Sequence, residues 1–158
     1  MDYSFIIRRA VEADASAIKE IVNDAFSRYA AGLGAPREIE ALRDTVADTV
    51  RDILTKDVFI ALIDEIPVGT VRAQVSDDGT AYISRLGVKS GYGNIGIGKS
   101  MMNLIDKLLI RKGVKTVRLH AASENYDLVR FYYGRGFHVD STAKDRGYIR
   151  ALMEKNIL

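Results

Sequence analysis

The spacing of apolar residues along the chain predicts a strand and then two helices in its first third. Phe5-Ile6-Ile7 is a short apolar run, typical of a strand, that leaves through Arg8-Arg9. Asp14 is a favourable N-cap, and apolar residues follow it at helical spacing: Ile18, Ile21, Val22, Ala25 and Phe26. Residues 30–35 break this period. Pro36 then suits the first position of a second helix, which turns these residues inward: Ile39, Leu42, Val46, Val50 and Ile53.

From residue 57 onward the pattern becomes that of β-strands. Apolar runs predict strands over 58–63, 67–75 and 81–88. The turns between them are Asp64-Glu65 and Asp78-Gly79, and connections this short join antiparallel neighbours.

The second half of the chain alternates between helices and strands. After a loop over 89–98, a long helix that ends at Gly113 carries an apolar stripe: Ile97, Met101, Leu104, Ile105, Leu108 and Leu109. A strand over 116–122 precedes a helix from Ser123 or Glu124 to Arg135, and strands over 137–141 and 148–155 follow. This order predicts an α/β fold with a mixed, mostly antiparallel central sheet of about seven strands and flanking helices. A β–α–β crossover lies in its middle.

Composition excludes several classes of protein. The 158 residues suit one domain over 1–158. The absence of cysteine excludes disulfides and a thiol nucleophile, and two isolated histidines leave little for a metal site, so we expect no metal. No apolar run nears the roughly 18 residues of a membrane span, and the N-terminus does not resemble a secretory signal, so we expect a soluble, cytoplasmic protein. A net charge of +2 gives no indication of nucleic-acid binding.

A cluster of glycines marks the junction between the strand over 81–88 and the helix that follows it. Gly91, Gly93, Gly96 and Gly98 are four of the 13 glycines in the chain. Glycine lets a backbone approach a ligand closely, and a helix N-terminus offers unpaired N–H groups. The segment therefore predicts a phosphate-binding site, with a merely flexible loop as the alternative.

Two well-known phosphate-binding patterns also match this loop by letter. Residues 91–96 satisfy GxGxxG, and residues 93–100 satisfy the P-loop pattern GxxxxGK[ST]. The context favours neither pattern. The preceding strand belongs to an antiparallel meander, no later core strand ends in a magnesium-binding Asp, and no acidic residue follows at the dinucleotide spacing.

A third interpretation is a family resemblance. Residues 83–98 resemble the acetyl-CoA-binding motif of the GNAT superfamily of N-acetyltransferases, written [QR]xxGx[GA], which falls on Gly93 to Gly98. Residues 125–137 resemble the second motif of that family, and the element order matches over essentially the whole chain. The chain departs from the pattern in having Gly93 where Gln or Arg is usual and Leu128 where a small residue is usual.

The resemblance implies acetyl-CoA as co-substrate. It places backbone groups of Leu86 and Val88 on the pantetheine arm, and it places the glycine loop on the pyrophosphate. The cofactor-binding residues that it implies are Leu86, Gly87, Val88, Gly93, Asn94, Ile95, Gly96, Ile97, Gly98, Lys99, Ser100, Asn125 and Tyr132. Lys99 either adds charge there or is simply solvated. Asn125 either contacts the pantetheine arm or begins a helix.

Tyr132 is the residue that the resemblance implies as general acid for the departing thiolate. A phenol pKa of about 10 exceeds that of a thiol, about 8.5, so full proton transfer is uphill by roughly 2 kcal/mol in water. Hydrogen-bond donation in a dry cleft already helps the thiolate to leave. The alternative is that Tyr132 fills the core.

The general base and the acceptor are less well defined. Many relatives carry Glu where this chain has Ser84, so His120, Glu124, Asp127 or an ordered water stay open as alternatives. Arg28 and Tyr29, in the segment after the first helix, and Ser84 are the expected acceptor-binding residues. The acceptor is an amine-bearing small molecule or peptide of unspecified identity.

The sequence thus predicts an N-acetyltransferase in which the amine attacks acetyl-CoA directly within a ternary complex. One alternative is a non-catalytic acyl-CoA-binding or sensor domain, which the missing Glu favours. Another is a P-loop nucleotide-binding protein. The resemblance also makes a homodimer possible.

Charge is unevenly distributed along the chain, which fits an anionic cofactor. Residues 81–120 contain eight basic residues and one acidic residue, a net +7, while the 15 basic and 20 acidic residues elsewhere give −5. A basic segment suits the phosphates of CoA, and a solvated helix face accounts for part of it.

Overall fold

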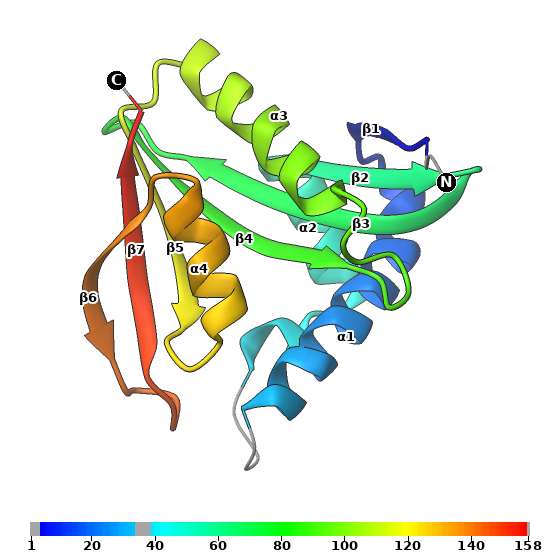
Figure 1. Ribbon diagram of the computed structural model, residues 1–158. Helices are drawn as coiled ribbons and strands as arrows, with labels where there is room; N and C mark the ends of the chain where they lie inside the picture. Colours follow the sequence, from blue (N-terminus) through cyan, green and yellow to red (C-terminus); the bar gives the residue numbers. More distant parts are fainter. Residues whose placement is uncertain (1–3, 34–38, 158) are drawn as a thin grey trace.

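The computed structural model describes residues 4–33 and 39–157, and these residues form one mixed sheet with helices on both faces (Figure 1). Its strands are β1 (Ile6–Arg9), β2 (Asp57–Ile63), β3 (Ile66–Val75), β4 (Thr80–Val88), β5 (Thr116–Ala122), β6 (His138–Ala143) and β7 (Arg150–Asn156). Their order across the sheet is β1-β2-β3-β4-β5-β7-β6. Only β4 and β5 pair in parallel among the described strands. The predicted fold class is confirmed.

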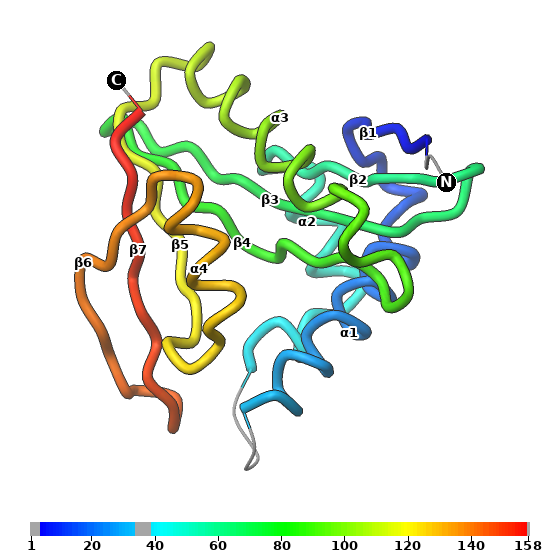
Figure 2. The backbone as a smooth tube through the Cα atoms, viewed as in Figure 1, coloured from blue at the N-terminus to red at the C-terminus, as the bar shows by residue number. Residues whose placement is uncertain are grey.

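Two helices cover each face of this sheet. On one side are α1 (Ala15–Gly32) and α2 (Val46–Thr55), with the short turns η1 (Glu12–Asp14) and η2 (Glu40–Arg43). On the other are α3 (Ile97–Arg111) and α4 (Tyr126–Gly134). Figure 2 traces α3 and α4 in front of the strands and α1 and α2 behind them. Because both faces are covered, all seven residues of β2 are buried, and alternate residues join opposite cores.

Two glycines allow helices to approach the sheet closely beside the site. A Cβ atom at Gly69 would lie 2.9 Å from Cγ2 of Ile97 in the first turn of α3. A Cβ atom at Gly87 would lie 3.0 Å from Cβ of Ala25 in α1. The start of α3 and the middle of α1 are therefore held against β3 and β4, one on each face.

The structure corrects two predicted helix boundaries. The first helix continues through Ala30 to Gly32, because the two alanines there are good helix formers. The second predicted helix is divided into η2 and α2, because Thr45 is extended and accepts the N–H of Asp48 in a new N-cap. Val46 is 42% exposed and not inward-facing. Pro36 lies outside the described residues.

The parallel pair β4–β5 separates soon after it forms. Only Thr80–Tyr82 of β4 pair with residues 116–118 of β5, and beyond this point the two strands diverge (Figure 1). A bulge opposite Val71 accompanies the divergence, where Arg85 has a positive φ of 55°. The facing edges of β4 and β5 therefore present backbone N–H and C=O groups that have no partner strand.

Candidate active site

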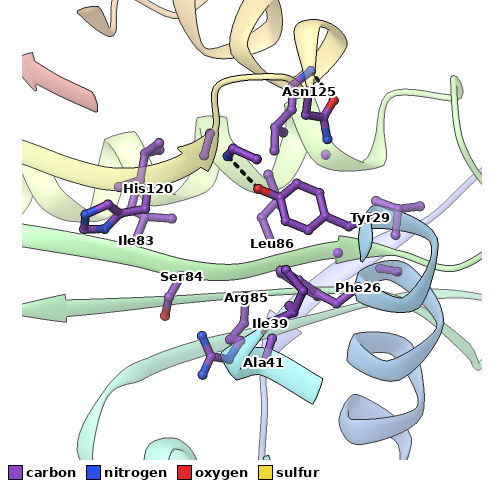
Figure 3. Close-up of a pocket in the computed structure, with 18 of the residues that line it drawn as sticks. Phe26, Tyr29, Ile39, Ala41, Ile83, Ser84, Arg85, Leu86, His120 and Asn125 are labelled. Carbon is purple, nitrogen blue, oxygen red and sulfur yellow. Dashed lines mark hydrogen bonds between the residues drawn. The ribbon is translucent and has the colours of Figure 1, made fainter. Parts of the chain in front are cut away.

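A cavity of about 920 Å³ lies where β4 and β5 diverge. Residues from α1, α2, η2, β3, β4, the glycine loop, the start of α3, β5, α4, the segment before β7 and β7 itself line it. Figure 3 draws part of this lining. Eleven of the predicted site residues are among them: Arg28, Tyr29, Ser84, Leu86, Gly87, Val88, Gly93, Asn94, Gly98, Asn125 and Tyr132. The fold therefore brings together residues that lie more than a hundred positions apart in the chain.

The other five predicted residues do not line the cavity, and the reason differs among them. Ile97 is 1% exposed because its side chain belongs to the core beneath α3, so it has only its backbone to offer a ligand. Lys99 is exposed in the first turn of α3. The remaining three are Ile95, Gly96 and Ser100.

The glycine loop presents bare backbone to the space in front of it. Gly96 is the N-cap of α3 with φ of 90°, a left-handed conformation that favours glycine. A Cβ atom built at Gly93, Gly96 or Gly98 would meet no atom within 4 Å. The first N–H groups of α3 have no partner within the helix, and the positive end of the helix dipole lies there. This junction is suited to an anion such as phosphate.

Tyr132 of α4 lines the cavity, and its ring packs in the core. The residue is 4% exposed, and its ring centroid lies 5.4 Å from that of Phe131 and 5.6 Å from that of Phe137. Burial, together with the nearby phenols of Tyr29 and Tyr82, raises the pKa of Tyr132 well above its usual range. Its hydroxyl is therefore neutral and able to donate a hydrogen bond at physiological pH.

Tyr29 bridges α1 and the end of β5. Its hydroxyl oxygen accepts the backbone N–H of Ala122 at 2.6 Å, on the edge of β5 left free by the divergence (Figure 3). Burial raises the pKa of Tyr29 to about 12. The phenol proton stays on the oxygen and is available to a second partner.

Arg28 is tied to the chain itself. Its Nη2 donates to the carbonyl oxygen of Val88 at 2.6 Å and to Asp24 at 3.1 Å. Asp24 also accepts the backbone N–H of Ser90 at 2.7 Å, and this bond lowers the pKa of Asp24. The guanidinium of Arg28 thus fixes the end of β4 against α1, and the carboxylate of Asp24 fixes the start of the glycine loop.

Asn125 performs one of its two predicted roles within the fold. Its side-chain oxygen accepts the N–H of Leu128 at 3.2 Å and caps α4. The amide nitrogen has no bond among the described residues, so it is available to a ligand in the cavity. Ser84 is half-buried on β4 and offers only a hydroxyl.

Of the three titratable alternatives for the base, only His120 lines the cavity. Glu124 and Asp127 are exposed outside it. His120 Nδ1 lies 2.5 Å from the hydroxyl of Tyr82 on β4. Burial lowers the pKa of His120, and the positive charges of Arg150 and Arg146 lower it further. The imidazole is therefore neutral near pH 7.

Sequence reasoning missed several polar residues of the cavity: Glu40, Tyr82, Arg85, Arg146 and Arg150. They come from four segments that no motif joins. The available signal was the alternation of strand residues, which places Tyr82, His120 and Arg150 on one face only once the strand order is known.

The described residues contain no group of three or more His, Asp or Glu side chains able to hold a metal ion. Within residues 4–33 and 39–157, none of the helices has both the length and the apolar character to cross a bilayer.

Comparison with known proteins identifies the family and the fold. The model of the Acetyltransferase (GNAT) family matches residues 16–137, which include α1 from its second residue, the glycine loop and all of α4. The chain belongs to the GNAT family of acetyltransferases. The resemblance noted in the two motifs is thereby confirmed, and the protein is an acyltransferase by family.

Solved GNAT structures share the fold at low sequence identity. The PaiA N-acetyltransferase of Thermoplasma acidophilum, solved with coenzyme A, is 22% identical with a TM-score of 0.84, covering 97% of this chain and 99% of that one. YncA of Salmonella typhimurium, solved with acetyl-CoA, is 19% identical with a TM-score of 0.76, covering 98% and 95%. The ribosomal-protein-S18-alanine N-acetyltransferase of Escherichia coli is 16% identical with a TM-score of 0.74, covering 98% and 94%.

Proposed function

We propose that this GNAT protein transfers the acetyl group of acetyl-CoA to an amine by direct attack within a ternary complex. The observation that supports this most is the continuity of one cavity. It runs from the glycine loop, along the unpaired edge of β4, to the hydroxyl of Tyr132 and the imidazole of His120.

The residues present fit coenzyme A. The pyrophosphate suits the bare backbone of Gly93 to Gly98 and the N-terminus of α3. The amides of the pantetheine arm suit the free edge of β4 at Leu86 and Val88, as an added strand would. The relatives PaiA and YncA were solved with CoA and acetyl-CoA, which supports the same ligand here.

Acetyl-CoA supplies a thioester, whose carbonyl carbon forms the new C–N bond with the amine as the C–S bond breaks. Tyr132 donates a hydrogen bond to the sulfur as it gains negative charge, since its raised pKa keeps the phenol protonated. The amine must lose a proton. We assign its acceptance, directly or through water, to the neutral imidazole of His120.

The first test separates the ligand classes by calorimetry. We expect CoA to bind to the purified protein and Mg-ATP not to bind. Binding of ATP without CoA would instead support the P-loop alternative.

The second test measures catalysis by the release of free thiol from acetyl-CoA across a panel of amines. We expect release that depends on both substrates. CoA binding without thiol release from any amine would favour a sensor domain, in keeping with the absence of a carboxylate at Ser84.

A further inference from the structure

The cavity holds a largely buried arginine that the proposed chemistry does not use. Arg150 is the first residue of β7, and its side chain is 12% exposed. Its one ion-pair partner among the described residues is Asp145, which lies 3.6 Å away and is 60% exposed. This distance is too long for a hydrogen bond, and a surface carboxylate holds such a partner weakly.

The guanidinium of Arg150 opens into the cavity. In the part of the chain that the structure describes, the buried side-chain nitrogens without a hydrogen-bond partner belong to Arg72 and Arg135. The nitrogens of Arg150 have no hydrogen bond and yet are not in this group, so they keep access to solvent. Arg150 also lines the cavity, so these nitrogens are available to a ligand there.

The sheet register places Arg150 beside the reacting groups. Arg150 pairs with Ala122 of β5, whose N–H binds Tyr29, and the neighbouring pair on the same face is Leu152 with His120. Figure 1 shows the start of β7 beside the end of β5 and well away from the glycine loop before α3. Arg150 therefore lies at the end of the cavity that is opposite the glycine loop and beside His120. We call this the acceptor end.

The other charges at this end do not cancel that of Arg150. Arg146 is paired with Glu40 at 2.8 Å, and Arg85 is paired with Asp44 at 2.8 Å, so these two cations are already balanced. The charge of Arg150 acts to lower the pKa of Tyr29, Tyr82 and His120. Positive charge therefore still dominates at this end of the cavity. The acceptor end thus carries a forked guanidinium whose one ion-pair partner among the described residues is the exposed Asp145.

We propose that Arg150 binds an anionic group of the acceptor, so that the acceptor is an amine that also carries a carboxylate, such as an amino acid or a short acidic peptide. A guanidinium binds a carboxylate through two parallel hydrogen bonds, which would orient the amine toward His120 and the thioester. A polyamine would instead bring positive charge to an already positive surface. This inference rests on the proposed function and specifies its substrate class.

The experiment compares matched amines as acceptors for the wild-type protein. Each set contains an amino acid, its carboxamide and the corresponding decarboxylated amine; O-phosphoethanolamine and spermidine are added. We expect kcat/KM for the best acid to exceed that of its amide at least about tenfold, as a lost charged partner predicts. A preference for O-phosphoethanolamine over the acids would support an anion-binding role for Arg150 and would overturn the assignment of a carboxylate to it. Equal or better use of amides or spermidine would overturn the inference.

Variants of Arg150 test whether this residue causes the preference for acids. Arg150→Gln should raise KM for the acid at least about tenfold and bring it level with the amide, while the Kd for CoA stays unchanged. Arg150→Lys, which keeps the charge but loses the fork, should fall between the two and serves if the first variant folds poorly. Arg130→Gln, an exposed arginine of α4 outside the cavity, is the matched control. A loss of CoA affinity in Arg150→Gln would place Arg150 at the cofactor and contradict the inference.

A binding measurement separates this inference from the proposed function. CoA-loaded protein is titrated with the N-acetylated acids and their N-acetylated amides. If the acids bind more tightly and Arg150→Gln abolishes the difference, the anion site stands even where no thiol is ever released. If thiol is released but neither readout distinguishes acid from amide, the acetyltransferase proposal stands and the anion site is wrong.

Discussion

At the scale of single residues, the hydroxyl of Tyr132 is the group whose role is most directly testable. Tyr132→Phe keeps the ring that packs on Phe131 and Phe137 and removes only the oxygen. We expect kcat to fall by about 10²-fold, the lower range for a lost acid, with KM for acetyl-CoA nearly unchanged. Thiol release under saturating substrates measures this.

Tyr133→Phe is the matched control for that variant. Tyr133 is the next residue of α4, is 52% exposed and does not line the cavity, so its hydroxyl should be dispensable. Full activity of Tyr132→Phe would show that the phenol only fills the core.

His120 makes the stability of the fold depend on pH. Burial, and then Arg150 and Arg146, lower its pKa, so the folded state resists a proton that the unfolded state accepts below about 6.5. The free energy of unfolding should therefore be unaffected by this residue above that pH and should fall as the pH drops below it. Urea unfolding at pH 8 and at pH 5.5 measures the difference.

His120→Gln should reduce that loss of stability. His138→Gln serves as the matched control, because His138 is the other histidine of the chain and is exposed on β6. An unchanged pH dependence in His120→Gln would contradict the assignment.

At the scale of elements, the junction of the glycine loop with α3 is needed for the ligand and not for the fold. A Cβ atom at Gly98 meets nothing within 4 Å, and the change gains helix propensity, so Gly98→Leu should leave the melting temperature unchanged or slightly higher. It fills the space in front of the loop, so CoA affinity should fall at least about tenfold. Calorimetry and thermal melting together measure both effects.

Gly134→Leu is the control for the same change elsewhere. Gly134 is exposed at the end of α4, also has open space at its Cβ position, and lies outside the cavity. CoA affinity within twofold of wild type in Gly98→Leu would remove the loop from the cofactor site.

A second element-scale feature is the ionic clamp between α3 and α4 that holds the helix of Tyr132. Asp106 of α3 accepts from Arg135 at 2.8 Å and from Lys155 of β7 at 3.1 Å. Both cations are largely buried, so Asp106→Asn should lower the free energy of unfolding by about 1–3 kcal/mol, less than for a fully buried pair because Asp106 is 23% exposed. Urea unfolding measures this. Asp140→Asn on the exposed strand β6 should change it by less than about 0.5 kcal/mol, and equal effects of the two would refute the clamp.

The elements themselves were largely predictable from the sequence, because both the strand and the helix periods are long and regular. The division between η2 and α2 was not predictable, because the helical spacing of apolar residues continues without a break past Asp44 and Thr45 to Val46 and Val50. The capping bond of Thr45 decides the break, and a local hydrogen bond of this kind leaves no trace in apolar spacing.

At the scale of the whole molecule, some residues of the site lie within sequence motifs, and others come together only through the order of the strands in the sheet. The glycine loop, Asn125 and Tyr132 lie in two short motifs and could be found in the chain. Tyr82, His120 and Arg150 share one face only because β5 lies between β4 and β7, an order that no local pattern contains. The residues of the acceptor end can therefore be identified only from the folded structure.

Charge distribution over the whole molecule gives the last prediction. In the basic segment 81–120, Arg85, Lys112 and Arg118 pair with Asp44, Asp57 and Glu154. The other five cations have no carboxylate within 4 Å among the described residues: Lys89, Lys99, Lys107, Arg111 and Lys115. Lys89 lines the cavity, and Lys99 lies in the first turn of α3. The field of unpaired positive charge at the predicted phosphate site thus comes from Lys89 and Lys99, because the other three cations lie in the C-terminal half of α3 or beyond it.

Such a field attracts the phosphates of CoA and is screened by salt, with a Debye length of about 30 Å at 0.01 M and about 8 Å at 0.15 M. The Kd for CoA should therefore rise several-fold, on the order of fivefold, between these two salt concentrations. Dephospho-CoA, which lacks the 3′-phosphate, should show a smaller rise, and Lys99→Gln should show a smaller rise for both ligands. A Kd that does not change with salt would mean that backbone N–H groups alone hold the phosphates and that the basic segment serves only solvation.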